Sequence, residues 1–476
     1  MRPSRALIAA SLFLAAAVAL TGCTATPPAA TAGSVTVIDV WLADYEFPHF
    51  LDPIRAQADR FGREHPGYQV KIEAFDYLTM PERIAAAGRA GKGPDVAQYY
   101  YTASQEARDT VGANGRPLFA PIGTEIAGRK EILGVPVVVD DLVPAARDYY
   151  SFGGVPFSMP KNVSTAVLYS NMEMLTAAGV TQPPQTWSEL EADCAAIART
   201  ATHPPNCVTW ANQGWFFQEA VGEQGGLLVD NDNGRSGRAE AVDLASPAMM
   251  AWVGWWKKLT DEGYYVYTGT QQDFIGTTQA FLSQQVAFTF NSSVPADFFV
   301  GVAAGSGFTA QVSRLPYNGD APYAGNQVGG DSLFLAAGLD PKTRDGALAF
   351  MQYLDAPDNT IAAHQVGGFI PVTRTAIEAL SRQGYYDQKP YELVPIDQLQ
   401  DVRRYAPGPV ALTAPPAQGA LLGDFARIED VMTQAMEDVL VRGADPFGRF
   451  TQATADAQAL LDRYNAAHPT GTGAGV

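Results

Sequence analysis

The sequence has few residues of the kinds that build catalytic and metal centres. Its 476 residues include only five histidines and three cysteines. No histidine stands at metal-ligand spacing from another ligand, and no nucleophile elbow, P-loop or dinucleotide-binding glycine motif occurs. We therefore expect no metal and no cofactor, and a binding protein in preference to an enzyme. A glycosidase stays open as an alternative, because two carboxylates at a suitable distance leave no local signature.

Basic residues are also scarce. Lys and Arg number 32 against 50 Asp and Glu, which gives a formal net charge of −18. Nucleic acids and anionic membrane surfaces are bound through clustered Lys and Arg, so neither is an expected partner. Charge of one sign forms no long run, and the acidic excess indicates solubility.

Only one long apolar run occurs, at the amino terminus. Arg2 and Arg5 precede the apolar residues 6–20, and Leu20-Thr21-Gly22-Cys23 then matches a bacterial lipobox. The run is too short for a membrane span and is typical of an export signal. We expect residues 1–22 to be removed and Cys23 to carry lipid, which places the protein outside the cytoplasm, anchored to the cell membrane. The alternative is a plain secretory signal with an incidental cysteine.

The segment after Cys23 is rich in Pro, Ala, Thr and Gly, and residues 23–34 are expected to form a flexible tether. The two remaining cysteines, Cys194 and Cys207, are close in sequence. In an exported protein they are expected to form a disulfide. A pair of buried thiols is the alternative.

Strands and helices alternate from residue 35 onward. Apolar runs that read as buried strands cover 35–41, 68–75 and 95–101, and helical patterns cover 52–64 and 81–90. This alternation predicts an α/β lobe with a doubly wound sheet. A chain of this length exceeds one core, so two lobes are expected.

The segment 153–171, GGVPFSMPKNVSTAVLYSN, organises the rest of the chain. Its prolines and paired glycines exclude a helix, and Thr165 to Tyr169 reads as a short buried strand. Asn171 is positioned to cap the following helix. The next segment, PPQTWSEL at 183–190, starts a second helix at Thr186 or Ser188.

These segments, with GGDSLFL at 329–335 and HQVGGFIPVT at 364–373, resemble the extracellular solute-binding proteins of carbohydrate-type ABC importers. The pattern is most similar to the glycerol-3-phosphate-binding members, and it covers residues 35–466. The resemblance implies an α/β, two-lobe periplasmic-binding-protein-like fold with a hinge and three inter-lobe crossings. The implied amino-terminal lobe is 35–156 and 321–370, the carboxy-terminal lobe is 157–320 and 371–468, and 469–476 is a loose tail.

Sugar-binding sites combine aromatic faces with amides and carboxylates. Side chains of these kinds near expected strand ends are the candidates: Trp41, Asp44, Tyr77, Tyr99, Tyr101, Trp187, Trp210, Trp215, Ser292, Asp331 and Phe369. For each aromatic residue, ordinary packing is the alternative. The spacing of Trp252, Trp255 and Trp256 favours core packing. Of the three consecutive tyrosines 99–101, at least one must face outward or into a cleft, because strand side chains alternate.

The resemblance to glycerol-3-phosphate-binding proteins implies ligand contacts at Tyr77, Ser164, Trp187, Ser293 and Gly330. Three positions depart from that pattern. A carboxylate is replaced by Tyr101, a tyrosine by Phe369, and the phosphate-gripping arginine by Leu421. Arg314, Lys161 or Arg404 could substitute for that arginine. A buried phosphate needs a cation, so the departures favour a neutral ligand.

The sequence thus predicts a monomeric, lipid-anchored solute-binding protein that delivers a sugar or oligosaccharide to the membrane subunits of an ABC importer. Glycerol 3-phosphate or a glycerophosphodiester is the alternative ligand. A surface glycosidase and a structural adhesin are the alternatives from other functional classes.

Overall fold

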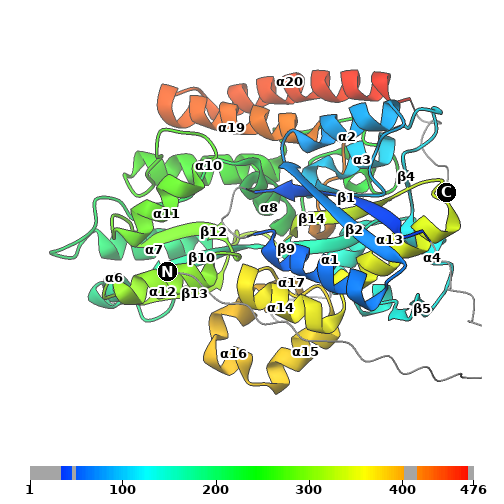
Figure 1. The fold of residues 1–476 in the computed structure, drawn as a ribbon. Helices are drawn as coiled ribbons and strands as arrows, with labels where there is room; N and C mark the ends of the chain where they lie inside the picture. The colour runs from blue at the N-terminus through cyan, green and yellow to red at the C-terminus, as the bar shows by residue number, and fades with distance from the viewer. Residues whose placement is uncertain (1–33, 46–49, 401–414, 470–476) are drawn as a thin grey trace, which may run out of the picture. The chain divides into compact units, whose positions relative to one another are not determined.

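The fold is built on two separate β-sheets, each covered by helices (Figure 1). The structure is a computed structural model and describes residues 34–45, 50–400 and 415–469. Helices and strands alternate along most of this length, as the sequence predicts for an α/β protein. The expected export signal and all but Ser34 of the expected tether lie outside the described residues.

The first sheet has the strand order β2-β1-β3-β14-β4, and β9 also pairs with β14. Its strands are β1 (Thr36–Asp44), β2 (Tyr68–Asp76), β3 (Val96–Tyr100), β4 (Phe119–Ala120), β9 (Met159–Ser164) and β14 (Gly329–Ala336). The strands predicted at 35–41, 68–75 and 95–101 are confirmed. β1 is parallel to β2 and β3, so the carboxyl ends of these three strands meet at one edge. Ligands of open α/β sheets bind at such edges.

Helices pack against this sheet and complete the first lobe. α1 (Asp52–Glu64) packs against β2, and α13 (Pro341–Leu354) packs against β1. α2 (Met80–Arg89) and α3 (Ser104–Asp109) contact β3. The helices predicted at 52–64 and 81–90 are thereby confirmed to within one residue.

The second sheet has the order β11-β12-β10-β13 and lies among different helices (Figure 1). It comprises β10 (Ala166–Asn171), β11 (Val208–Thr209), β12 (Phe288–Ser292) and β13 (Ala310–Arg314). Beside it, α10 (Pro247–Asp261) brings Trp252, Trp255 and Trp256 against Trp210, with all four indoles buried. The prediction that the three tryptophans of this helix are core residues is confirmed.

Two predicted helix starts are confirmed in atomic detail. The Asn171 side chain accepts a hydrogen bond from the amide of Met174 and caps α6 (Met172–Ala177). Thr186 caps α7 (Trp187–Ile197) and forms a capping box with Glu189. Each cap satisfies helix-terminal N–H groups that would otherwise lack a partner.

The chain passes between the two sheets in the middle of the segment 153–171. Ser164 ends β9 in the first sheet and Ala166 begins β10 in the second, so Thr165 alone separates them. The chain returns between β13 and β14. A third contact between distant segments is the antiparallel bridge between Val163 of β9 and Ile370. Ile370 lies in the connection between α14 (Pro357–Gly367) and α15 (Arg374–Arg382).

The last two helices run side by side (Figure 1). They are α19 (Phe425–Arg442) and α20 (Pro446–Ala467), close to the predicted bounds, and Gly443 ends α19 in the left-handed conformation. α19 packs on α8 (Gly214–Glu223), which comes after β11 of the second sheet. It also contacts η1 (Tyr101–Ala103), which directly follows β3 of the first sheet.

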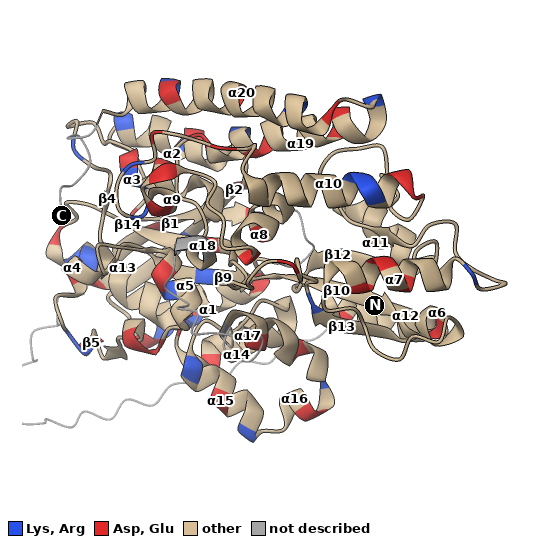
Figure 2. Cartoon of the chain, turned by 180° about the vertical axis from the view of Figure 1, so that it is seen from behind, with Lys and Arg blue, Asp and Glu red and all other residues tan. Residues whose placement is uncertain are grey.

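The remaining elements are short or lie at the periphery. They are α4 (Ile122–Ile126), β5 (Glu131–Ile132), β6 (Val135–Pro136), η2 (Val139–Asp141), α5 (Pro144–Tyr149), β7 (Ser151–Phe152), β8 (Val155–Pro156), α9 (Asp230–Gly234), α11 (Phe274–Leu282), α12 (Ala296–Gly305), α16 (Tyr385–Gln388), η3 (Pro390–Glu392), α17 (Leu393–Gln400) and α18 (Pro415–Gln418). Acidic and basic residues are interspersed along helices such as α15 and α19 (Figure 2). Within the described ranges, no helix is both long and apolar enough to cross a membrane.

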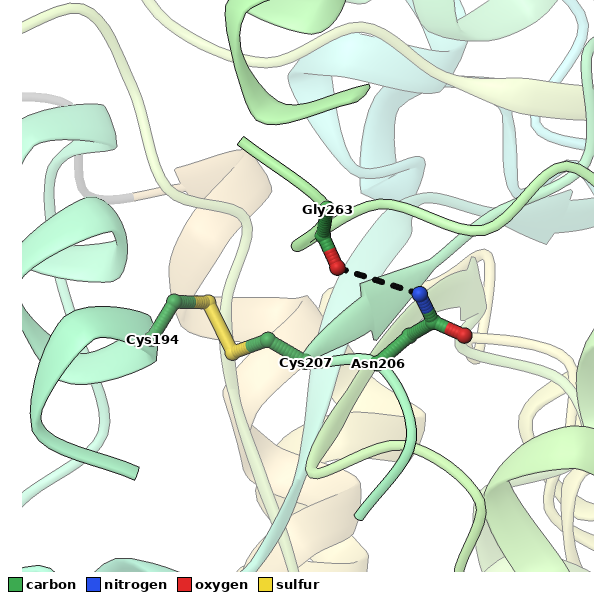
Figure 3. The surroundings of a disulfide bond; sticks show 4 residues. All are labelled: Cys194, Asn206, Cys207 and Gly263. Carbon is green, nitrogen blue, oxygen red and sulfur yellow. Dashed lines mark hydrogen bonds between the residues drawn. A yellow bond between two sulfur atoms is a disulfide. The ribbon is translucent and has the colours of Figure 1, made fainter. Parts of the chain in front are cut away.

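The predicted disulfide is present. Cys194 near the end of α7 is bonded to Cys207, which directly precedes β11 (Figure 3). Both cysteines are buried. Next to Cys207, the Asn206 side-chain amide donates a hydrogen bond of 3.0 Å to the Gly263 carbonyl (Figure 3). The disulfide therefore ties α7 to the second sheet.

Replacing both cysteines with serine is expected to lower the free energy of unfolding by about 2 to 3 kcal/mol, because the bond closes a short loop and restricts the unfolded chain. Cys194 and Cys207 are 13 residues apart. Urea denaturation of the protein and of the double serine variant measures the difference. Equal urea midpoints would contradict a stabilising role for the disulfide.

Candidate ligand-binding site

Five half-buried aromatic side chains meet at the carboxyl edge of the first sheet. Tyr45 follows β1, Tyr77 follows β2 and Tyr100 ends β3. The Tyr77 ring centroid lies 5.1 Å from that of Tyr45 and 5.6 Å from that of Tyr100. The Phe50 ring centroid lies 5.2 Å from that of Tyr45 and 5.9 Å from that of Phe369, so Phe50 links these two rings. We call Tyr45, Phe50, Tyr77, Tyr100 and Phe369 the aromatic cluster.

A buried carboxylate fixes one side of the aromatic cluster. Asp331 of β14 is fully buried and accepts a hydrogen bond of 2.7 Å from the Tyr45 hydroxyl. It accepts a second, of 2.8 Å, from the side-chain amide of Asn162 on β9. Burial raises the pKa of Asp331, and the hydrogen bonds from Tyr45 and Asn162 oppose that rise. The network connects the Tyr45 hydroxyl, through Asp331 of β14, to Asn162 of β9.

A second buried carboxylate reaches the cluster from the opposite end of the sequence. Glu429 lies on α19 and is 6% exposed. Its Oε1 accepts a hydrogen bond of 2.8 Å from the hydroxyl of Tyr101, whose ring centroid is 4.6 Å from that of Tyr100. Its Oε2 accepts one of 3.3 Å from the Gln213 side-chain amide. Burial raises the pKa of Glu429 to about 8, although the Tyr101 hydrogen bond opposes the rise.

Trp215 and two close backbone approaches form the neighbouring wall. A Cβ on Gly329 would lie 3.0 Å from both the Trp215 ring and the Ser164 hydroxyl oxygen, so this indole packs directly on the β14 backbone. Gly330 has φ of 116°, and a Cβ there would lie 1.8 Å from the Asn162 carbonyl oxygen. Only glycine fits at position 330.

The structure brings several of the predicted site residues to one place. Tyr77 and Phe369 belong to the aromatic cluster, Tyr101 and Asp331 contact it, and Ser164, Trp215 and Gly330 lie beside it. Ser293 directly follows β12 and contacts the crossing, since its hydroxyl accepts a hydrogen bond of 3.2 Å from the Thr165 amide.

Other predicted residues lie elsewhere. Trp187 is 5% exposed, stacks on Trp255 at 4.8 Å and donates its indole N–H to the Pro316 carbonyl, so it is a core residue of the second lobe. Tyr99 is buried between Phe119 and Phe334 in the first lobe. Neither side chain belongs to the aromatic cluster, and the ligand contacts expected for these two residues stay predictions.

Three further candidates lie on β1 and β12 and are not members of the aromatic cluster. Trp41 is half-buried, and its ring packs edge-on against Phe75. Asp44 ends β1 and is half-buried. Ser292 ends β12, where its carbonyl accepts a hydrogen bond from Tyr169.

Several residues of the site were missed from the sequence. These are Tyr45, Phe50, Tyr100, Gln213 and Glu429. Tyr45 and Tyr100 had a usable signal, because both stand at strand ends. Glu429 had none, since it is 328 residues from Tyr101 and lies on an ordinary amphipathic helix.

Two of the cations considered as replacements for an arginine at position 421 have other partners, although the charge of Lys161 also opposes the burial-induced rise in the pKa of Asp331. Lys161 forms a buried ion pair with Asp355 at 3.6 Å, and Arg314 donates a hydrogen bond of 2.6 Å to the Tyr323 hydroxyl. Arg404 lies outside the described residues. Among residues that the structure does describe, no lysine or arginine forms an ion pair with Asp331 or Glu429. Leu421 is buried at 2% exposure.

Two cavities have no member of the aromatic cluster in their lining. One of about 290 Å³ is lined by residues such as Asp297, His364, Gly368, Lys389 and Glu392, and the other, of about 260 Å³, lies between β13 and α12. Neither is lined by a predicted site residue. Within the described part of the chain, no three His, Cys, Asp or Glu side chains are placed to hold a metal ion.

Comparison with known proteins agrees with this architecture. The sn-glycerol-3-phosphate-binding periplasmic protein UgpB of Yersinia pestis is 28% identical over 453 residues, which cover 92% of this chain and 95% of that protein. UgpB from Mycobacterium tuberculosis in complex with glycerophosphocholine superposes with a TM-score of 0.66 at 24% identity, covering 90% of this chain and 99% of that one.

A third relative binds a different ligand class. The cyclic alpha-maltosyl-1,6-maltose binding protein from Arthrobacter globiformis superposes with a TM-score of 0.69 at 18% identity, covering 90% of this chain and all of that one. These structural matches establish the two-lobe, periplasmic-binding-protein-like fold. Residues 56–385 match the family described as bacterial extracellular solute-binding protein. With that match extending over more than half its length, the chain belongs to the bacterial extracellular solute-binding protein family, whose members are binding proteins of ABC importers rather than enzymes.

Proposed function

We propose that this protein binds a neutral sugar or oligosaccharide against the aromatic cluster and delivers it to the membrane subunits of an ABC importer. The observation that carries the proposal is the meeting of five aromatic rings with the buried carboxylates Asp331 and Glu429. Pyranose faces are weakly apolar and stack on such rings, while carboxylates accept hydrogen bonds from sugar hydroxyls. Rings and carboxylates are sufficient for this mode of binding, which needs neither a metal nor a cofactor.

Glycerol 3-phosphate or a glycerophosphodiester is the second candidate, and the names of the relatives favour it. A phosphate buried at this site would need a charged or multiple hydrogen-bond donor. Leu421 offers none at the position where the glycerol-3-phosphate-binding pattern has arginine, and Lys161 is held by Asp355. We therefore rank the neutral ligand first.

Delivery is proposed to depend on hinge closure between lobes 35–156 with 321–370 and 157–320 with 371–468. The hydrogen bond between Tyr101 and Glu429 joins residues assigned to different lobes. Residues 159–164 form β9 of the first sheet, so we propose that the boundary expected at residue 157 lies at Thr165, and the contacts of Asp331 with Tyr45 and Asn162 are within the first sheet. A ligand that contacts both lobes stabilises the closed form, which the importer then recognises. We propose that the protein acts as a monomer.

The lipid anchor is also part of the proposal. Cys23 stands in the lipobox sequence LTGC and lies outside the described residues. Growth with labelled palmitate is expected to label the protein, and Cys23→Ala should abolish the label. Equal labelling of both proteins would contradict lipidation at Cys23.

A thermal-shift panel tests the ligand class. The full exported chain in mild detergent is heated alone, with neutral mono- and oligosaccharides, with glycerol 3-phosphate and with glycerophosphodiesters. A ligand present at 100 times its Kd stabilises the folded state by about 2.7 kcal/mol and raises the Tm measurably. At least one neutral saccharide is expected to do so. A shift produced by phosphate compounds alone would overturn the proposed function.

Tyr77→Ala is expected to weaken binding of that saccharide by more than about tenfold, because it removes a stacking surface from the centre of the aromatic cluster. Tyr77 contacts both Tyr45 and Tyr100. Tyr77→Phe keeps the ring and serves as the control, with an affinity within about threefold of the parent protein. Titration calorimetry measures both variants, and unchanged affinity in Tyr77→Ala would remove Tyr77 from the site.

A further inference from the structure

We propose that Glu429 determines the ligand class, by accepting a hydrogen bond from a ligand hydroxyl and by excluding phosphate esters from the aromatic cluster. This inference rests on the proposed function, since it assigns a selective role within the same site. It concerns a residue for which the sequence offered no signal, at the end of the chain opposite to the first sheet.

Three residues from two elements hold the Glu429 side chain in one position. Tyr101 of η1 donates to Oε1, and Gln213, which precedes α8, donates to Oε2. The aliphatic part packs on Gly214, where a Cβ would lie 2.3 Å from both Cβ and Cγ of Glu429. Any larger residue at position 214 would displace the carboxylate. The site is therefore built around this side chain.

The carboxylate retains capacity for a ligand. Each carboxylate oxygen accepts about two hydrogen bonds. Tyr101 and Gln213 supply one to each oxygen. A hydroxyl of a neutral ligand lying on the adjacent Tyr100 ring would find an unused acceptor position. A phosphate ester oxygen is itself an acceptor, so it would gain no hydrogen bond from an ionised Glu429.

The groups that face Glu429 do not neutralise it. Burial raises the pKa of Tyr77, Tyr100, Tyr101 and Tyr149, and the nearby charge of Glu429 adds to each rise, while Arg235 opposes it at Tyr149. These tyrosines come from the ends of β2 and β3, from η1 and from α5. On α19 itself, Asp430 adds a second negative charge nearby. Gln213, before α8, is neutral. Arg235 is a basic group that contacts one of these neighbours: its guanidinium lies 4.6 Å from the Tyr149 ring centroid, but it donates to the backbone carbonyls of Tyr149 and Gly419 and not to Glu429. An anionic ligand at the Glu429 carboxylate would therefore have to bind beside a negative charge or take up a proton.

The Glu429 carboxylate disfavours an anionic ligand, whereas the arginine of the glycerol-3-phosphate-binding pattern favours one. That pattern places arginine at position 421 and a carboxylate at position 101. Here position 421 is a buried leucine, and position 101 is a tyrosine that donates to the carboxylate of Glu429. The site thus has a carboxylate on α19 in place of one at position 101, and no arginine at position 421.

Glu429→Gln tests this role, because glutamine keeps the size and an acceptor oxygen for Tyr101 but loses the charge. Titration calorimetry of the full exported chain at pH 6 and pH 8.5 uses two probes, maltotriose and glycerophosphoglycerol, a diester with one fixed negative charge. At pH 8.5 the variant is expected to bind glycerophosphoglycerol at least tenfold more tightly than the parent protein does. The parent protein should bind that probe more tightly at pH 6 than at pH 8.5, and the variant should bind it equally at both.

Asp430→Asn is the matched control, since it removes the same charge from an exposed neighbour whose carboxylate accepts from Gln272. It should change neither probe's affinity by more than about threefold. Equal glycerophosphoglycerol affinity in Glu429→Gln and the parent protein at pH 8.5, including no binding to either, would overturn the role of Glu429. Tight binding of glycerophosphoglycerol and of no saccharide by the parent protein would overturn the proposed function instead. If Glu429→Gln then still tightened that binding, the role of Glu429 would survive.

Discussion

Replacing Trp187 with alanine is expected to lower the free energy of unfolding by about 4 kcal/mol while leaving saccharide affinity within about threefold. Removal of a buried tryptophan side chain leaves a cavity and costs about 3–5 kcal/mol. Trp187 is 5% exposed, stacks on Trp255, contacts Trp252 and donates its indole N–H to the Pro316 carbonyl. Urea denaturation measures the stability, and titration calorimetry measures the affinity.

Trp187→Phe is the matched control. Phenylalanine keeps an aromatic ring in the stack but loses the hydrogen bond to Pro316, so a smaller loss of stability is expected. The opposite pattern in Trp187→Ala, a loss of affinity above tenfold with an unchanged urea midpoint, would return Trp187 to the binding site and contradict its assignment to the core.

The stability of the protein is expected to fall between pH 5 and pH 8 because carboxyl groups are buried without basic partners. Glu219 of α8 is the clearest case. It is completely buried and accepts hydrogen bonds of 3.1 Å from the Gln327 amide and the Asn326 side chain. Burial raises its pKa from 4.5 to about 8, against the effect of those hydrogen bonds.

The sign of the effect follows from this rise in pKa. Because the folded state holds the proton more tightly than the unfolded state, the contribution is fully present below about pH 4.5 and is lost as pH rises to about 8. The loss from Glu219 alone is on the order of 3 kcal/mol. Glu219→Gln keeps one side-chain oxygen that can accept both hydrogen bonds, from Gln327 and Asn326. The variant should therefore be more stable than the parent protein at pH 8 and similar to it at pH 5.

Urea denaturation at the two pH values checks this prediction. Asp430→Asn again provides a control, since Asp430 is exposed and its removal should leave the pH dependence largely intact. A parent protein and a Glu219→Gln variant with the same pH dependence would show that Glu219 does not titrate in this range in the folded state.

Local signals in the sequence were sufficient for most of the fold. Helix α1 begins and ends at the predicted residues 52 and 64, because Pro53 favours its start and the His65-Pro66-Gly67 segment stops its continuation. Asn171 and Thr186 cap helices as expected. The pairing of Cys194 with Cys207 was also predicted correctly. Each of these features depends on residues close together in the chain.

The candidate site was predicted less well, because it depends on which elements meet in space. Alternation of side chains indicated that one of the three tyrosines 99–101 lies outside the core, and Tyr100 is the half-buried one. The sequence could not distinguish Trp187, which joins a tryptophan core, from Trp215, which packs on Gly329. Glu429 reaches Tyr101 only through the packing of α19 on α8 and η1, which no local pattern encodes.

Titration calorimetry of the full exported chain against a set of neutral oligosaccharides and a set of glycerophosphodiesters distinguishes the two ligand classes. We expect saturable binding of at least one saccharide, and binding of every diester that is at least tenfold weaker at pH 8. Tight binding of a diester with no binding of any saccharide would contradict this expectation, and would mean that a cation outside the described residues, such as Arg404, provides the charge that Leu421 lacks.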